Sequence, residues 1–198
     1  MATVVVPFRG SDPKRRLEPM SGRARAELAG AMLADVLEAA VAVGRVFVVA
    51  PDAPTLPDTV EHVDDPHRGQ GAAGRAGLDA ATAAGAPPPY LVVNADLPCA
   101  TARDLLALAG AIPEGGLAIA AATDGTTNAL GLADERLFEP LYGSGSAQRY
   151  AACAPSRIVD TPNLIDDVDT IDDLARLSAR VGSSTRRVLT ALRIGEAA

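Results

Sequence analysis

The order of apolar and polar positions along the chain predicts alternating strands and helices. Three short runs are almost entirely apolar: residues 3–7 (TVVVP), 46–50 (VFVVA) and 90–95 (YLVVNA). Continuous apolar runs of this length, rich in β-branched residues, are typical of strands that are buried on both faces of a sheet. We therefore expect these three runs to form the centre of a parallel sheet.

Between the first two strands, residues 23–43 predict a long helix. Ser21 is placed to cap its start, and Gly44 follows its end. Its apolar positions recur at helical spacing and predict one buried face: Leu28, Met32, Leu33, Val36, Leu37 and Ala40. A strand, a helix and a second strand in this order predict parallel pairing through a right-handed crossover.

The rest of the chain repeats this alternation. Further strands are expected at residues 60–63, 117–122, 124–133 and 157–160. Further helices are expected from the glycine-rich stretch to about residue 84, at 102–110, from about 146, and at 170–181 and 184–193. The pattern predicts an α/β fold, a three-layer α/β/α sandwich with a mostly parallel, Rossmann-like sheet. The length is suited to one domain, residues 1–198.

Charge narrows the class of ligand. The formal net charge is -7 and the sequence pI is about 4.8, so we expect no nucleic-acid partner. Six basic residues nevertheless gather near the start: Arg9, Lys14, Arg15, Arg16, Arg23 and Arg25. Local positive charge in an acidic chain favours a small anionic ligand. A solvated basic loop is the alternative.

We expect neither export nor a membrane partner. The opening MATVVVPF enters an apolar strand directly and lacks the regions of a signal peptide. No uninterrupted apolar run approaches the roughly 20 residues that a membrane span needs. Cys99 and Cys153 give neither a disulfide framework nor a metal-binding spacing. These features predict a cytoplasmic protein.

The stretch DDPHRGQGAAGRAG, residues 64–77, contains a formal match to the glycine pattern of dinucleotide-binding loops, with Gly69, Gly71 and Gly74. In an NAD-type fold that pattern follows the first strong strand, whereas here the preceding strand is short and weak. Two other interpretations stay open. The stretch is a flexible loop that begins an alanine-rich helix, or its glycines allow a different nucleotide to lie against the backbone.

Carboxylates stand where ligands bind in open α/β sheets, beyond the carboxyl ends of strands. Asp96 follows the strand at residues 90–95, within the sequence NADLP. Asp167 and Asp169 are two apart, so in an extended segment they point the same way, and Thr170 can cap the next helix. Three converging carboxylates favour a bound cation such as Mg²⁺. Alternatively, the tail acids supply negative charge at a helix N-terminus.

A resemblance to a known family covers nearly the whole chain. Six segments carry it: VVVPFRGSDPKRRLEP, AELAGAMLADVLEAA, NADLP, DGTTNAL, YGSGSAQRY and DVDTIDDLARL. Together they resemble the 2-phospho-L-lactate/phosphoenolpyruvate guanylyltransferase family of coenzyme F-420 biosynthesis. The resemblance implies a nucleotidyltransferase fold of the nucleotide-diphospho-sugar transferase (GT-A-like) type. It also implies a magnesium-dependent transfer of GMP from GTP to a three-carbon phospho-acid, with release of pyrophosphate.

The resemblance further implies a role for each matching residue. Arg9, Lys14 and Asp96 would be catalytic. The nucleotide would be bound by Arg9, Lys14, Arg16, Gly69, Gln70, Gly71, Ala72 and Asn94. The phospho-acid would be bound by Thr127, Asn128, Gly143 and Ser146. Asp96, Asp167 and Asp169 would hold Mg²⁺. The product would pass to a transferase that joins it to a deazaflavin precursor.

Two departures from the family pattern affect these expectations. Relatives read Gly-Leu-Asn-Ala-Ala where this chain reads Gly-Gln-Gly-Ala-Ala, and the first loop is one residue shorter, with Arg9 in place of an expected Lys. Phosphoenolpyruvate is the preferred acceptor because the composition is typical of GC-rich genomes, and 2-phospho-L-lactate comes next. The strictness for GTP, the number of metal ions and the oligomeric state, a homodimer among the options, stay open.

Two rival functions remain at this stage. A molybdopterin or sugar-phosphate nucleotidyltransferase would use the same scaffold, but those enzymes carry a glycine-rich first loop that FRGSDPKRRL does not match. A non-catalytic nucleotide-binding subunit has little need of the three acids Asp96, Asp167 and Asp169. Pyrophosphate release in the presence of each candidate acid distinguishes these functions.

Overall fold

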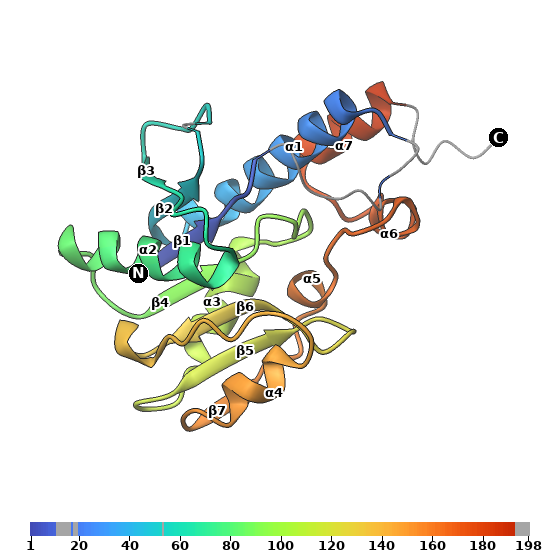
Figure 1. The fold of residues 1–198 in the computed structure, drawn as a ribbon. Coiled ribbons are helices and arrows are strands. Elements are labelled where there is room, and N and C mark those ends of the chain that lie inside the picture. Colours follow the sequence, from blue (N-terminus) through green and yellow to red (C-terminus); the bar gives the residue numbers. More distant parts are fainter. Residues whose placement is uncertain (11–16, 18–19, 53, 193–198) are drawn as a thin grey trace.

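The computed structural model describes residues 1–10, 17, 20–52 and 54–192 (Figure 1). The strands of the described chain are β1 (Ala2–Pro7), β2 (Gly44–Ala50), β3 (Val60–Asp64), β4 (Tyr90–Val93), β5 (Leu117–Ala121), β6 (Thr127–Leu132) and β7 (Ser156–Ile158). The helices are α1 (Gly22–Val41), α2 (Gln70–Ala83), α3 (Ala102–Gly110), α4 (Ser146–Ala151), α5 (Pro162–Ile165), α6 (Ile171–Leu177) and α7 (Ser183–Ala191), with a short 3₁₀ turn η2 (Glu135–Leu137).

The strands form one mixed sheet in the order β3-β2-β1-β4-β6-β5-β7. Pairing is parallel except on the two sides of β6, which runs antiparallel to both β4 and β5. β1 and β4 are adjacent, with Thr3 opposite Tyr90 and Val5 opposite Val92. The chain proceeds from β1 to β2 on one side and to β4 on the other, so the strand order reverses between β1 and β4.

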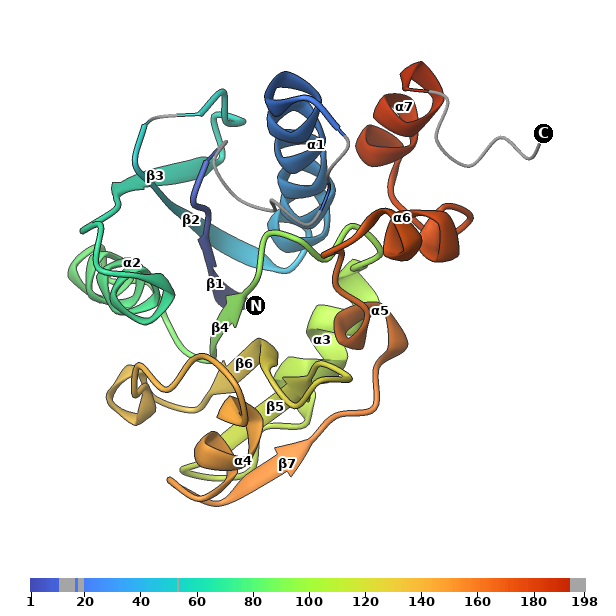
Figure 2. The same cartoon turned by 45° about the vertical axis from the view of Figure 1, so that its right-hand side comes forward.

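Helices cover both faces of the sheet, as Figure 2 shows. On one face, alternate side chains of the central strands, such as Val4 and Leu91, pack against α1, α3 and α5. On the other face, Val5 and Val92 pack with α2, α4 and the residues after η2. Because successive side chains of a strand point to opposite faces, strands covered on both sides are apolar at every position. The predicted three-layer α/β/α sandwich is confirmed.

A third apolar cluster lies at the outer side of α1, where α6 and α7 pack against it (Figure 2). Its fully or almost fully buried members come from four parts of the chain: Leu17, Leu28, Met32, Cys99, Val168, Leu174, Leu177, Val181 and Leu189. This cluster attaches the C-terminal segment to the sandwich at the end where the strands' carboxyl ends lie.

The predicted elements are confirmed, with shifts at their ends. Ser21 caps α1, since its hydroxyl accepts a hydrogen bond from the N–H of Ala24 at 3.2 Å. The strand predicted to residue 95 ends at Val93, ahead of the turn at Ala95 and Asp96. The helix predicted over 170–181 ends at Leu177, and the short helix α5 was not predicted. Within the described residues, no helix is both long and apolar enough to cross a membrane.

Candidate active site

Two adjoining cavities lie beyond the carboxyl ends of β1 and β4, where the strand order reverses. The first has a volume of about 250 Å³ and lies beside the end of β1 and the three residues that follow it, 8–10. The second has a volume of about 490 Å³ and lies toward β6. Four residues line both cavities: Gln70, Asn94, Asp96 and Asp169. Reversal points of this kind leave a crevice in open α/β sheets, which is where their ligands bind.

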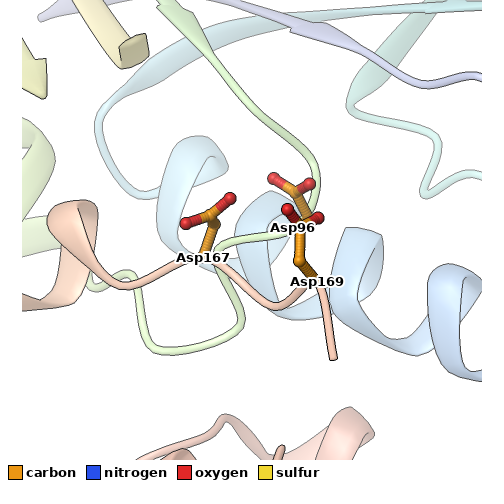
Figure 3. A group of neighbouring side chains, drawn as sticks. All are labelled: Asp96, Asp167 and Asp169. Atoms are coloured by element: carbon orange, nitrogen blue, oxygen red, sulfur yellow. The ribbon is translucent and has the colours of Figure 1, made fainter. Parts of the chain in front are cut away.

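Three carboxylates converge at the boundary between these cavities. Figure 3 shows Asp96, on the loop after β4, facing Asp167 and Asp169 on the segment before α6. One oxygen from each carboxylate lies within 4.8 Å of the other two, and all three side chains are half-buried. Anionic oxygens gathered this closely fit a hard divalent cation such as Mg²⁺ or Mn²⁺, which takes oxygen ligands.

Local hydrogen bonds hold the segment that carries Asp167 and Asp169. Thr170 and Asp173 form a capping box at the start of α6: the Thr170 hydroxyl accepts from the N–H of Asp173 at 3.2 Å, and the Asp173 carboxylate accepts from the N–H of Thr170 at 2.9 Å. The same carboxylate accepts from the N–H of Asp169 at 3.2 Å. The cap that the sequence predicts at Thr170 is therefore present, and it orients the backbone of Asp169.

Asp166, which precedes Asp167 in the chain, is paired with two arginines. Its carboxylate accepts hydrogen bonds from Arg176, at 2.6 Å, and from Arg180. Partial burial acts to raise the pKa of Asp166, but the hydrogen bonds and positive charge of Arg180 and Arg176 outweigh it and hold this pKa below its usual value. Asp166 therefore has a structural role, because its ion pairs join the start of the acidic segment to α6 and the residues after it.

In the first cavity, a loop with a left-handed residue faces the turn after β1. Gly69 has a φ of +91°, a conformation that favours glycine, and it precedes the first turn of α2. A Cβ at Gly69 would lie 3.8 Å from the guanidinium of Arg9, so the two segments lie against each other. Arg9 and Gly69 both line the cavity. A cation and a glycine loop are therefore adjacent there.

Two amides form a chain of hydrogen bonds between the cavities. The Nδ2 of Asn94 donates to the backbone carbonyl of Thr127 at 3.3 Å, and the Nε2 of Gln70 donates to the Oδ1 of Asn94 at 2.6 Å. Because a carbonyl oxygen can only accept, Thr127 fixes the orientation of the Asn94 amide, and Asn94 then fixes that of Gln70. The Gln70 side chain is left with its carbonyl oxygen as the atom that can bind a donor.

The second cavity is lined by β6 and by the glycine-rich turn before α4. Thr127, Asn128 and Gly143 all line it. Asn128 is buried; its Nδ2 donates to the carbonyl of Ile165 at 2.9 Å, and its Oδ1 has no hydrogen-bond partner among the described residues. Ser146 lies behind this wall, where its hydroxyl is 2.9 Å from that of Thr127. The residues expected to bind the phospho-acid are thus gathered around one cavity.

The described structure leaves several of the expected site residues outside the cavities. Gly71 and Ala72 lie in the first turn of α2 and are not among the residues that line either cavity. A Cβ at Gly71 would lie 2.6 Å from the Cβ of Pro140, so this position has no room for a side chain. Lys14 and Arg16 lie outside the described residues.

Three further residues of the second cavity were missed by the sequence analysis: Asp124, Thr126 and Tyr142. Asp124 accepts hydrogen bonds from both the N–H and the hydroxyl of Thr126 in the turn before β6. Burial, with Tyr150 beside it, raises the pKa of Tyr142 well above its usual value, so this phenol stays neutral. Each lies within an identified motif, DGTTNAL or YGSGS, and that membership was the available signal.

The sequence of the chain matches a known protein family. Residues 15–165 match the family model of the MobA-like NTP transferase domain. A phosphoenolpyruvate guanylyltransferase of Sphaerobacter thermophilus is 37% identical over 165 residues, covering 75% of this chain and 77% of the relative. A 2-phospho-L-lactate guanylyltransferase of Natrialba magadii is 35% identical over 198 residues, covering 88% of this chain and 82% of the relative.

Solved structures share the fold at lower identity. A protein of Desulfovibrio desulfuricans G20, assigned to the nucleotide-diphospho-sugar transferases, superposes with a TM-score of 0.71 at 17% identity, covering 98% of this chain and 95% of that one. A Mycobacterium tuberculosis H37Rv protein, solved in complex with manganese, superposes with a TM-score of 0.52 at 19% identity, covering 89% and 97%. The expected fold type is therefore confirmed.

Proposed function

Because this chain belongs to the MobA-like NTP transferase family, and within it to the phosphoenolpyruvate and 2-phospho-L-lactate guanylyltransferases, we propose that it transfers GMP from GTP to the phosphate of a three-carbon phospho-acid. The reaction releases pyrophosphate and belongs to coenzyme F-420 biosynthesis. We further propose that residues 1–198 act as one nucleotidyltransferase domain, and that the product is consumed by a separate transferase.

The observation that carries this proposal is the pair of adjoining cavities with a shared acidic wall. A transfer between two phosphorylated substrates needs two subsites that meet at the reacting phosphorus. The first cavity, beside Arg9 and Gly69, would take the nucleotide, and the second, beside Thr127 and Gly143, would take the phospho-acid. Asp96 and Asp169 line both, so they stand where the two substrates would touch.

The chemistry requires no nucleophile from the protein. An oxygen of the acceptor phosphate attacks the α-phosphorus of GTP, a P–O–P phosphoanhydride bond forms between the two, and the bond from the α-phosphorus to pyrophosphate breaks. Because both reactants are anions, the groups that help most are those that neutralise and align them. Arg9, which lines the first cavity, would hold the triphosphate. By resemblance, Lys14 and Arg16 would do the same.

We propose that the three carboxylates Asp96, Asp167 and Asp169 hold a divalent cation, with Mg²⁺ as the preferred ion. When bound, the cation would offset the charge of the reacting phosphates. The capping box at Thr170 and Asp173 holds the backbone of Asp169, and the buried Asn128 lines the second cavity. The acceptor carboxylate and phosphate would accept hydrogen bonds from the Thr127 hydroxyl and from backbone N–H groups near Gly143.

A direct assay tests this function. The protein is mixed with Mg²⁺, GTP and one acid at a time (phosphoenolpyruvate, 2-phospho-L-lactate, or none), and pyrophosphate release and the mass of the product are measured. We expect acceptor-dependent release, highest with phosphoenolpyruvate. Asp96→Asn should reduce the rate at least about 100-fold, as loss of a central electrostatic group does. Asp172→Asn, at an exposed acid of α6, is the matched control and should leave the rate unchanged.

Absence of pyrophosphate release with every three-carbon phospho-acid would contradict the proposal. Release with a sugar phosphate or molybdopterin in place of the acid would assign the chain to another transferase of the same fold. Nucleotide binding without any transfer would indicate a binding subunit. Replacing GTP by ATP in the same assay measures how strictly the first cavity selects the base.

A further inference from the structure

A buried carboxylate outside the active site caps the last helix of the described chain. Asp35 lies in the middle of α1 and is only 4% exposed. Its Oδ1 accepts from the N–H of Ser184 at 2.8 Å and its Oδ2 from the N–H of Thr185 at 2.9 Å. These N–H groups belong to the first turn of α7, whose own cap residue, Gly182, supplies no side-chain bond. Asp35 therefore satisfies donors that a helix start leaves without partners.

The contact between α1 and α7 is close enough to exclude any side chain at Gly182. A Cβ there would lie 2.4 Å from the Cγ of Asp35. The N–H of Gly182 donates to the carbonyl of Pro98 at 2.8 Å. Pro98 is two residues beyond Asp96. Gly182 therefore contacts both the buried carboxylate of Asp35 and the turn that follows Asp96.

The other two acids of the cluster are joined to the same assembly through Val168. Val168 stands between Asp167 and Asp169, and its side chain is fully buried in the third apolar cluster with Met32 of α1 and Leu189 of α7. Its N–H donates to the backbone carbonyl of Asp96 at 3.1 Å. The position of Asp167 and Asp169 thus depends on how the C-terminal segment sits on α1.

We propose that Asp35 is a positioning residue for the cation site: by capping α7 it holds the C-terminal segment at the depth on α1 where Asp167 and Asp169 meet Asp96. This inference rests on the proposed function, because it assumes that the three acids bind a cation. Asp35 itself is in the middle of α1 and acts only through the backbone of α7, Gly182 and the packing of Val168.

Cation affinity in the folded protein separates this role from a purely stabilising one. Mn²⁺ alone, without nucleotide, is titrated into the full chain, and free Mn²⁺ is followed by electron paramagnetic resonance. Asp35→Asn replaces one acceptor oxygen by an N–H₂ group that faces a backbone donor. We expect its Mn²⁺ dissociation constant to rise roughly tenfold, the low end of the effect of residues that support metal ligands. Hydrogen exchange at Ser184 and Thr185 should become faster.

A second variant perturbs the same contact from the opposite side. Gly182→Ala leaves Asp35 intact but places a methyl group against its carboxylate, so it should weaken Mn²⁺ binding in the same direction. Glu38→Gln, at an exposed acid one turn further along α1, is the matched control and should change neither quantity. All titrations are made at a temperature where each variant is shown to be folded by circular dichroism.

The outcomes distinguish the positioning role from the proposed function. If Asp35→Asn and Gly182→Ala accelerate exchange in α7 while the Mn²⁺ affinity stays at the wild-type value, the positioning role is wrong and the cation site stands. Unchanged exchange in both variants also overturns it. If the wild-type chain binds no Mn²⁺, or if Asp96→Asn binds Mn²⁺ as tightly as wild type, the cation site itself is wrong. The positioning role is then wrong as well.

Discussion

Gln70 illustrates how a single side chain acquires a direction from its neighbours. Alone, a glutamine amide can present either a donor or an acceptor to a ligand. Here the carbonyl of Thr127 orients Asn94, and the Nε2 of Gln70 donates to the Oδ1 of Asn94, so the orientation of the Gln70 amide is set and its carbonyl oxygen is the atom that can accept from a ligand. A ribose hydroxyl and the N–H groups of guanine are both suitable donors.

We expect Gln70→Leu to raise the KM for GTP about fivefold, the effect of one net hydrogen bond of about 1 kcal/mol, with little change in kcat. Steady-state kinetics at saturating acceptor checks this. Repeating the assay with dGTP and ITP locates the lost bond: a substrate that lacks the relevant donor should be insensitive to the substitution. An unchanged KM for all three nucleotides would show that Gln70 makes no bond to the nucleotide.

At the scale of elements, the glycine pattern that resembles a dinucleotide fingerprint has a packing explanation. Gly71, Gly74 and Gly77 are three apart, so they share one face of α2, and a Cβ on any of them would meet a neighbour closer than 3.0 Å. The neighbours are Pro140, Phe138 and Val5, respectively. These glycines let α2 approach the sheet and the segment after η2, while Gly69 supplies the left-handed turn.

We expect Gly77→Ala to lower the free energy of unfolding by about 1–3 kcal/mol, because its methyl group would lie 2.3 Å from the Cγ1 of Val5 and 2.8 Å from the Cγ2 of Val49. Urea unfolding followed by circular dichroism measures the change. The control is Gly30→Ala, at an exposed position of α1 with no atom within 4 Å of the added carbon. It should raise the stability by about 0.5–1 kcal/mol. Equal effects at both positions would contradict the packing explanation.

The acidic segment is joined to α6 by an ion pair with a definite pH dependence. Since Arg180 and Arg176 hold the pKa of Asp166 below its usual value of about 3.9, this carboxylate stabilises the fold above about pH 4. The contribution is lost as the pH falls through the folded-state pKa. We therefore expect Asp166→Asn to lower the melting temperature at pH 7, and the difference from wild type to shrink at pH 3.

Thermal unfolding of wild type and variant at pH 7, 5 and 3 checks this dependence. Asp172→Asn serves as the control, since Asp172 is an exposed acid of the same helix. A wild-type-to-variant difference that stays constant from pH 7 to pH 3 would indicate that the ion pair of Asp166 contributes nothing to stability.

At the scale of the whole molecule, the cavities lie where distant parts of the chain meet, so ligands should stabilise the entire fold. Asp96 follows β4, whereas Asp167 and Asp169 belong to a segment some 70 residues later that is attached through α1 and α7. A ligand that binds only the folded state adds about 2.7 kcal/mol of stability at 100 times its dissociation constant. We expect Mg²⁺ with GTP to raise the melting temperature by several degrees.

The same stabilisation should be strongly reduced in Asp96→Asn, and GTP without a divalent cation should give a smaller shift. Thermal unfolding with and without chelator measures both. Equal shifts for wild type and Asp96→Asn would show that the nucleotide binds independently of the acidic cluster. These shifts in melting temperature would also show whether nucleotide binding in the first cavity depends on the acidic cluster.

Local patterns determined most of the fold and the types of residue at the site. The apolar runs at β1, β2 and β4 are explained by burial on both faces, and Thr170 was predicted as a cap because its hydroxyl can accept a hydrogen bond from an N–H of the first helical turn. Asp96 was identified because it follows an apolar strand, and Asp167 and Asp169 because they stand two apart just before the cap of a helix.

Only the tertiary structure decided what depends on segments that are distant in the chain. The pairing of β6 with β4, the shared wall of the two cavities, the amide orientation of Gln70 and the cap that Asp35 supplies to α7 all join residues more than 20 positions apart. Such contacts leave no periodic trace in the sequence, because periodicity records which face of an element is buried and not which partner buries it.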